Sequence, residues 1–457
     1  MIFYGSKNGK GDEKICLSKI KAFTKEHPFI FYGIIVGIIV LIVIVVVLCI
    51  VLTRKKENIE EQENEEIKIF PLKESSKSEV IDIYNKIGNN DKGTLAQFGK
   101  YLSEKTNNLK EEQKVYLAYY WITKNIKYDY AGRRAGTVEF DPSKVFQKRT
   151  TVCSGYSILF KELLLLMNYT ESKIKNIVGY SKGEGYSSFE EPKEDHEWNA
   201  VEINGQWCLI DTTWDATLKT EYYLCTPPRC FVRDHLPSYD NSLQFLKNPI
   251  SLETFHQRVE TKEGYCKYNV DIIEDKAIQT FCGKGKVIIK YSIEKENART
   301  FLDFSPVVNA FSTIPIFPSY FVTRIKDGFN IDISVNEKSR SQLAILLNNS
   351  FVGAINFNCD KEPNEKFYYP IVFEPYRRSD AELISPIQGN LIRGQSYNFE
   401  IRTNEFEELY LYKTNGNIKM VKQGNIFKVD NVVVEGKSIT ISKNIYDCLV
   451  SFDIVDE

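Results

Sequence analysis

Three polar side chains in the middle of the sequence have the types and the order that nucleophilic catalysis uses: Cys153, His196 and Asp211. A cysteine attacks a carbonyl carbon as the thiolate, so it needs a base that removes its proton. Histidine suits that role at neutral pH, and a carboxylate fixes the tautomer of the ring and stabilises its charged form. The three residues therefore indicate covalent chemistry at a carbonyl group.

The segment around Cys153 predicts that the sulfur lies in the first turn of a helix. Helical periodicity runs from Thr151 to Met167, and Thr151 is a suitable N-cap residue. The unpaired N–H groups and the positive dipole end of a helix favour a thiolate at this place. Gly155 would leave the surface beside the sulfur uncrowded.

The segment from His196 to Asp211 predicts a hairpin that brings these two residues together. Two short alternating strands flank Asn204-Gly205, a dipeptide typical of two-residue hairpin turns. In the register in which the strands pair directly across this turn, the two side chains are diagonal neighbours on one sheet face, and such neighbours lie about 7–8 Å apart. A shift of one residue would put them on opposite faces.

Each of these residues also has an interpretation without chemistry. Cys153 could be structural, His196 could be a histidine of the core, and Asp211 could cap the turn that follows it. We expect the two later histidines, His235 and His256, to be structural or to lie in surface loops, because neither has a comparable partner. With four scattered histidines and no Cys-x-x-Cys pair, the sequence predicts no metal site and no cofactor.

Composition narrows the class of protein. The 457 residues include 59 Lys+Arg and 61 Asp+Glu, which give a formal charge of −2. This balance argues against a nucleic-acid binder, which normally has an excess of basic residues. Hydrophobic residues make up 43% of the chain, as expected of domains with buried cores, and ten cysteines are too few for a disulfide scaffold.

An apolar run near the N-terminus predicts a single transmembrane helix. Residues 28–53 contain no charged side chain, and about 20 apolar residues of helix suffice to cross a bilayer. A tail (1–27) precedes this segment, and a charged stalk (54–75) follows it. Basic residues are equal in number on the two sides, so the positive-inside rule gives no orientation.

The short tail and the large body favour a body outside the cytoplasm. This orientation would expose the glycosylation sequons at Asn168 and Asn348. It would also allow disulfides, with Cys225 and Cys230 as the nearest candidates.

Beyond residue 250 the pattern changes to strands. Apolar residues alternate with polar ones, as in Phe329, Ile331, Ile333 and Val335, and turn signals recur every ~8–12 residues, a spacing typical of antiparallel β-sandwiches. We expect two such modules, 250–360 and 361–457, after an α+β domain over 76–245.

Blocks of this domain resemble the transglutaminase-like superfamily. They are WITKNIKYD (121–129), DPSKVFQKRTTVCSGYSILFKELL (141–164), HEWNAVEINGQWCLIDTTWD (196–215) and YYLCTPPRCFVRDHLP (222–237). The branch that the blocks resemble most is that of kyphoscoliosis peptidase, and the later strands are similar to the β-repeats that follow in this branch. The resemblance implies a papain-like core in which Cys153 is the nucleophile, His196 the base and Asp211 its orienting group.

The sequence departs from the family pattern at two places beside this triad. Glu197 stands where a small residue is usual, and Thr212 stands where proline is common. Neither change removes a member of the triad. The paired Cys-x-x-Cys motifs of peptide N-glycanases are missing, and no acidic loop with calcium-ligand spacing is found.

The predicted fold class is thus α+β: a papain-like transglutaminase core after one N-terminal transmembrane helix, followed by two antiparallel, Ig-like β-sandwich modules. The predicted function is that of a membrane-anchored cysteine peptidase or acyltransferase acting on carboxamide or peptide bonds of proteins, by hydrolysis or transamidation. The alternative is a non-catalytic membrane-anchored scaffold that binds protein partners. Neither hypothesis involves nucleic acid.

Overall fold

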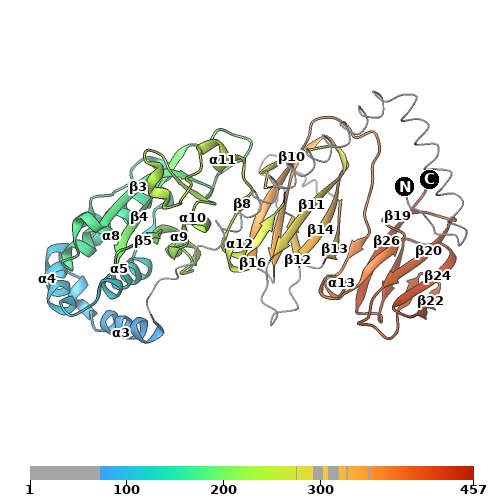
Figure 1. Cartoon of the computed structure of the whole chain (residues 1–457), viewed down its shortest axis with the longest axis horizontal. Helices are drawn as coiled ribbons and strands as arrows, with labels where there is room; N and C mark the ends of the chain where they lie inside the picture. Colours follow the sequence, from blue (N-terminus) through green and yellow to red (C-terminus); the bar gives the residue numbers. More distant parts are fainter. Residues whose placement is uncertain (1–72, 274, 292–301, 307–318, 326–327, 348–349) are drawn as a thin grey trace, which may run out of the picture. The chain divides into compact units, whose positions relative to one another are not determined.

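The computed structural model describes residues 73–457 except 274, 292–301, 307–318, 326–327 and 348–349. In this part of the chain, helices dominate at the start and strands at the end (Figure 1). The predicted tail (1–27), the membrane segment (28–53) and most of the stalk (54–75) lie outside the described residues. The last two residues of the predicted stalk, 74 and 75, belong to the first described helix, which begins at Glu74.

The predicted fold class needs a correction on its transmembrane helix. Crossing a bilayer takes about 20 consecutive apolar residues of helix. No helix in the described part of the chain is long and apolar enough to do so, and the longest of them, α5 (Glu111–Asn125), has 15 residues that include several charged ones. Over the described residues the fold is an α+β domain followed by two β-sandwich modules.

The α+β domain is built around a five-stranded sheet in the order β6-β5-β4-β3-β7, in which every pair is antiparallel. Its strands are β3 (Ile174–Ser181), β4 (Glu194–Ile203), β5 (Gln206–Ile210), β6 (Leu224–Thr226) and β7 (His235–Pro237). Apart from this sheet, β1 (Lys127–Tyr128) pairs with β2 (Thr150–Thr151). The helices of the domain are α3 (Glu74–Asn85), α4 (Leu95–Thr106), α5, α6 (Tyr130–Ala135), α7 (Pro142–Lys148), α8 (Cys153–Leu166), α9 (Thr212–Leu218), α10 (Pro228–Phe231) and α11 (Leu252–Gln257).

The hairpin between β4 and β5 has the register that the Asn204-Gly205 turn predicts. Ile203 pairs with Gln206, and Asn199 pairs with Ile210. Both turn residues have positive φ, 50° and 80°, which the two central positions of a type I′ turn require. This prediction is confirmed, and it fixes the faces of β4 and β5.

Helix α8 packs on the sheet and on α5 through its apolar side. Leu159, Phe160, Leu163 and Leu164 are buried in one cluster with Trp121 of α5. Burying one such side chain is worth about 1.5–3 kcal/mol. The packing therefore holds the first turn of α8 at a fixed place beside β4.

The first β-module consists of two sheets, β10-β16-β15-β12, with β8 also on β16, and β13-β14-β11-β9. Side chains of both sheets, such as Ile331 and Ile355, share one apolar core. The strands are β8 (Glu260–Thr261), β9 (Val270–Ile272), β10 (Ile278–Thr280), β11 (Gly283–Tyr291), β12 (Leu302–Pro306), β13 (Ser319–Ile325), β14 (Gly328–Val335), β15 (Ser339–Leu347) and β16 (Ser350–Cys359), with one helix, α12 (Glu263–Lys267), between β8 and β9.

The second β-module again pairs two sheets, β17-β26-β25-β21-β22, with β19 on β26, and β18-β20-β24-β23. Phe399 and Phe452 come from different sheets and meet edge to face in the shared core. The elements are β17 (Ile371–Val372), α13 (Glu374–Arg378), β18 (Glu382–Ser385), β19 (Asn390–Ile392), β20 (Ser396–Arg402), β21 (Tyr410–Lys413), β22 (Gly416–Lys419), β23 (Val421–Gln423), β24 (Ile426–Val433), β25 (Ser438–Ser442) and β26 (Cys448–Val455).

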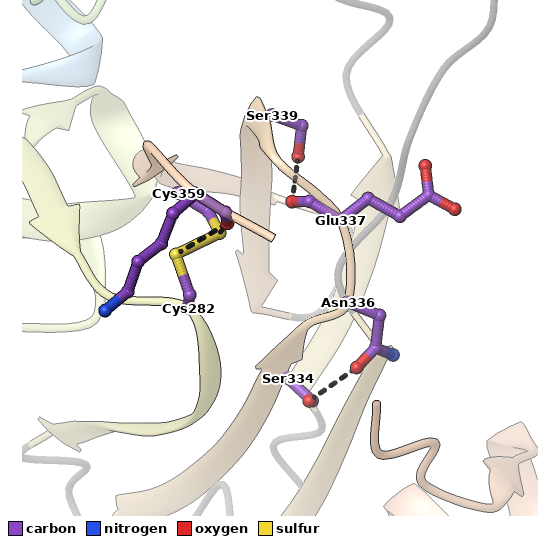
Figure 2. Close-up of a disulfide and its surroundings, with 7 residues drawn as sticks. Cys282, Ser334, Asn336, Glu337, Ser339 and Cys359 are labelled. Atoms are coloured by element: carbon purple, nitrogen blue, oxygen red, sulfur yellow. Dashed lines mark hydrogen bonds between the residues drawn. A yellow bond between two sulfur atoms is a disulfide. The ribbon is translucent and has the colours of Figure 1, made fainter. Parts of the chain in front are cut away.

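Two disulfides are present among the described residues, and neither is the predicted Cys225–Cys230 pair. Cys230 is bonded to Cys266, while Cys225 is a buried free thiol in β6 beside Cys208 of the neighbouring strand. The prediction was wrong because it used only nearness in sequence. Cys230 lies in α10, and the fold places it beside Cys266 of α12. Figure 2 shows the other bond, in which Cys282, between β10 and β11, is joined to Cys359, the last residue of β16.

Candidate active site

Cys153 is the first residue of α8, as predicted, although the helix is not capped by Thr151. The N-cap residue is Val152, which makes no side-chain cap. Thr151 is still part of strand β2, and its hydroxyl donates to the Glu139 carbonyl. Gly155 lets the first turn of α8 pack closely against Thr151, because a Cβ atom at its position would come within 1.9 Å of the Thr151 hydroxyl oxygen. The thiol is free and partly exposed.

His196 and Asp211 are in direct contact. Asp211 ends the hairpin, and its Oδ2 lies 2.7 Å from His196 Nε2. Its other oxygen, Oδ1, accepts hydrogen bonds from the backbone N–H groups of Thr213 and Trp214, at 2.8 and 3.1 Å. Asp211 thus caps α9, as one of its two interpretations predicted, and contacts His196 at the same time.

The third member of the group, Cys153, lies on the other side of the His196 ring. Nε2 is bonded to Asp211, so the ring nitrogen that remains for the thiol is Nδ1. Burial opposes the thiolate, but a hydrogen bond with His196 and the charge of that ring lower the pKa of Cys153, and the backbone N–H of Glu197 helps. All three residues singled out by the sequence are therefore brought together.

The charges of His196 and Asp211 depend on each other. Burial disfavours the imidazolium, yet the Asp211 carboxylate raises the pKa of His196 to about 10. Burial likewise disfavours the carboxylate, and the two histidine partners of Asp211 hold its pKa well below the usual range. A thiolate beside an imidazolium is thus favoured at neutral pH.

His235 is a member of this cluster that the sequence interpretation missed. Its Nε2 lies 3.1 Å from Asp211 Oδ2, and its Nδ1 lies 2.7 Å from Asp234 Oδ1. It is buried in β7, which pairs with β3. Of the two expected alternatives, a structural histidine or one in a surface loop, the surface loop was wrong, and so was the expected lack of a partner. The adjacent acid in Asp234-His235 was the one signal that the sequence offered.

His256, by contrast, stays near the surface. It lies in α11, half-buried, with its Nδ1 3.1 Å from the Tyr186 hydroxyl. It takes no part in the cluster around Asp211.

One set of described residues has the composition of a metal site. Ligand atoms of His196, Asp211 and His235 lie within 4.8 Å of one another. However, the two nitrogen–oxygen distances, 2.7 and 3.1 Å, are those of hydrogen bonds. Hydrogen bonds within the cluster account for these distances without a metal ion.

A cavity of about 390 Å³ opens beside His196. Aromatic and apolar side chains form part of its wall, and Tyr130 and Leu218 are exposed at 46% and 60%. Charged side chains of both signs are also present, among them Glu260 of β8 and the nearby Lys262. The residues that line the cavity include Tyr130, His196, Trp214, Leu218, Glu260 and Lys262.

Comparison with known proteins identifies the kind of domain that contains these residues. Residues 96–230 match the family model described as a transglutaminase-like domain. The chain carries a transglutaminase-like domain. Kyphoscoliosis peptidase from Homo sapiens is 30% identical over 230 residues, which are 46% of this chain and 33% of that protein. The protein of the same name from Mus musculus is 32% identical over 196 residues, 39% of this chain and 29% of that protein.

A further relative is the Lim and transglutaminase domain protein ltd-1 of Caenorhabditis elegans. It is 29% identical over 149 residues, 28% of this chain and 20% of that protein. The aligned part spans about a third or less of the length of each of these relatives. The family match and the two kyphoscoliosis peptidases support a transglutaminase-like domain of the kyphoscoliosis peptidase-like branch, as the sequence blocks predicted.

Proposed function

We propose that this protein is a cysteine enzyme, a peptidase or a transglutaminase-like acyltransferase, that acts on carboxamide or peptide bonds of proteins. The observation that carries the proposal is the contact chain from Cys153 through His196 to Asp211, at the side of an open cavity. The match of residues 96–230 to a transglutaminase-like domain supports it.

The first half-reaction is acylation of the sulfur. The Cys153 thiolate attacks the carbonyl carbon, and an S–C bond forms while the carbonyl oxygen takes up negative charge. The N–H groups of the first turn of α8 have no partner within the helix, so the backbone N–H of Cys153 is a suitable donor to this oxygen. The C–N bond then breaks, and His196 passes its proton to the departing amine.

The second half-reaction releases the acyl group. Neutral His196 removes a proton from water or from an acceptor amine, whose oxygen or nitrogen attacks the thioester. The C–S bond breaks and the thiolate returns beside the imidazolium. Water gives hydrolysis, and an amine gives transamidation. Asp211 keeps Nε2 protonated throughout, so that Nδ1 faces the sulfur.

The cysteines of the chain permit a direct test by alkylation. Folded full-length protein is treated with iodoacetamide at neutral pH, and the rate at each cysteine is read by peptide mass spectrometry. We expect Cys153 to react at least tenfold faster than Cys208 and Cys448, which are also free and partly exposed. Equal rates at the three thiols would contradict the proposal and favour a scaffold that only binds protein partners.

A second experiment looks for products. Cleaved and crosslinked proteins are profiled by mass spectrometry in cells that express the wild type, Cys153→Ala or the matched control Cys448→Ala. We expect new termini or crosslinks with the wild type and with Cys448→Ala, and none with Cys153→Ala. The kind of product then distinguishes hydrolysis from transamidation.

A further inference from the structure

We propose that His235, held by Asp234, is a positioning residue for the reaction, which fixes the Asp211 carboxylate and offsets part of its charge beside His196. This inference rests on the proposed function, since it concerns the same site. It starts from a feature that a cysteine–histidine–aspartate triad does not need: two imidazoles share one carboxylate oxygen. Asp211 Oδ2 lies 2.7 Å from His196 and 3.1 Å from His235.

The contacts of His235 determine its protonation. Nδ1 lies 2.7 Å from Asp234 Oδ1, and Nε2 lies 3.1 Å from Asp211 Oδ2. An ionised carboxylate only accepts hydrogen bonds, so each ring nitrogen that faces one must donate. Both nitrogens therefore carry hydrogen, and His235 is an imidazolium buried between two carboxylates.

Asp234 is built to hold that cation in place. Its Oδ1 accepts from His235, while its Oδ2 accepts from the Tyr223 hydroxyl at 2.7 Å and from Lys262 Nζ at 3.4 Å. Both Asp234 and His235 are almost fully buried, with 2% and 1% of their surface exposed. Buried charges of this kind persist only when they are paired and hydrogen-bonded, and here every charge has a partner.

The consequence for the site is both geometric and electrostatic. Backbone N–H groups hold Oδ1 of Asp211, and His235 holds Oδ2, so the carboxylate cannot rotate away from His196. The imidazolium of His235 also cancels part of the field that Asp211 exerts on His196. Titratable groups of several elements surround this pair of histidines: Cys153 of α8, Asp211 and Asp215 at the start of α9, Tyr223 before β6, Asp234 before β7 and Lys262 after β8.

The test separates the charge of His235 from its hydrogen bond. His235→Gln keeps a donor near Asp211 but removes the positive charge, so the full field of Asp211 acts on His196. We expect the titration of His196 to move upward by about one pH unit, followed through the ring carbon signals of ¹³C-histidine in full-length protein. His196→Gln assigns the signal among the four histidines. A purely structural role would lower the yield of folded protein without moving this titration.

The matched control is His256→Gln, which removes a histidine outside the cluster and should leave the titration of His196 unchanged. If His235→Gln does not fold, Asp234→Asn gives the second test. It removes the carboxylate that keeps His235 charged, and we expect the same upward shift. An unchanged titration of His196 in the folded variant overturns the inference. Equal alkylation of Cys153 and the other free thiols in the wild type overturns the proposed function instead, so the two failures are distinguishable.

Discussion

The α+β domain and the second β-module bury different kinds of side chain. Around the site, the carboxyl groups of Asp211 and Asp234 and the imidazole of His235 are only 0–2% exposed. In residues 371–455, which the structure describes throughout, the buried polar side chains are Ser379, Thr403 and Ser442, none of which carries a charge. The charged side chains of that module lie at its surface, as in the pair Arg402–Glu382.

This difference shows what each region is built for. Apolar strands such as those of the second module gain stability directly from burial, at about 25 cal/mol per Å² of apolar surface. Burying carboxylates costs free energy unless every oxygen has a partner. His196, Asp211, Asp234 and His235 are nevertheless buried and connected. The chemistry proposed for Cys153 would account for this arrangement, which stability alone does not require.

The largest expected effect tests the site itself. Cys153→Ala and His196→Ala should each lower activity by on the order of 10³-fold or more, and the double variant should be little worse, because the members of a triad act as a unit. Turnover of a substrate found by product profiling gives the measurement. Additive losses would show that the two residues do not act in one step.

The second prediction concerns the disulfide of the first β-module. Cys282 and Cys359 are separated by 77 positions, and closing a loop of this length is worth about 4 kcal/mol in the chain-entropy estimate. Replacing both by serine should speed amide hydrogen exchange in β11 and β16. All four tryptophans lie between 121 and 214, so tryptophan fluorescence reports the unfolding of the α+β domain. The midpoint of this transition should be the same as in the wild type. Loss of the fluorescence transition would mean that the two regions depend on each other.

The third prediction returns to the buried charge. Asp211→Asn leaves two histidines without their carboxylate and should cost about 3 kcal/mol at pH 7. The pKa of Asp211 is lowered in the folded protein, so the carboxylate stabilises the fold above the pKa of the unfolded chain, about 3.9, and this contribution is lost as the pH falls further. The difference in urea midpoint between wild type and variant, read by tryptophan fluorescence, should therefore shrink between pH 5 and pH 3. A constant difference would contradict a charged Asp211.

Local patterns predicted the part of the site that is close in sequence. The Asn204-Gly205 turn fixed the register of β4 and β5, and with it the His196–Asp211 contact. Helical periodicity likewise placed Cys153 in a first turn. Both predictions rest on contacts within one or two neighbouring elements.

What the sequence did not predict depends on contacts between distant segments. His235 reaches Asp211 because β7 pairs with β3, Ser181 opposite His235, and no turn signal connects these strands. Cys230 finds Cys266 for a similar reason, across 36 positions. The α+β domain and the β-strands beyond it follow from periodicity, whereas the partners across the core follow from tertiary packing.

The smallest expected effect concerns an exposed ion pair of the second β-module, which we compare with the buried pair between Arg233, before β7, and Asp275, before β10. Arg402 donates to Glu382 at 2.7 Å, but their side chains are 46% and 47% exposed. Water screens such a pair, and ordering two long side chains offsets the gain, so Arg402→Gln should destabilise the second module by about 0.5 kcal/mol or less.

The matched change is Arg233→Gln. Arg233 is buried and donates to Asp275, to the Val259 carbonyl at 3.0 Å and to the Thr261 hydroxyl at 3.1 Å. Removing it deprives Asp275 of its buried cation and should cost about 3 kcal/mol. Urea unfolding of both variants, followed by circular dichroism and tryptophan fluorescence, measures the contrast. If both variants lose the same free energy of unfolding, burial does not determine how much an ion pair stabilises this protein, and the contrast between buried and exposed charges would be contradicted.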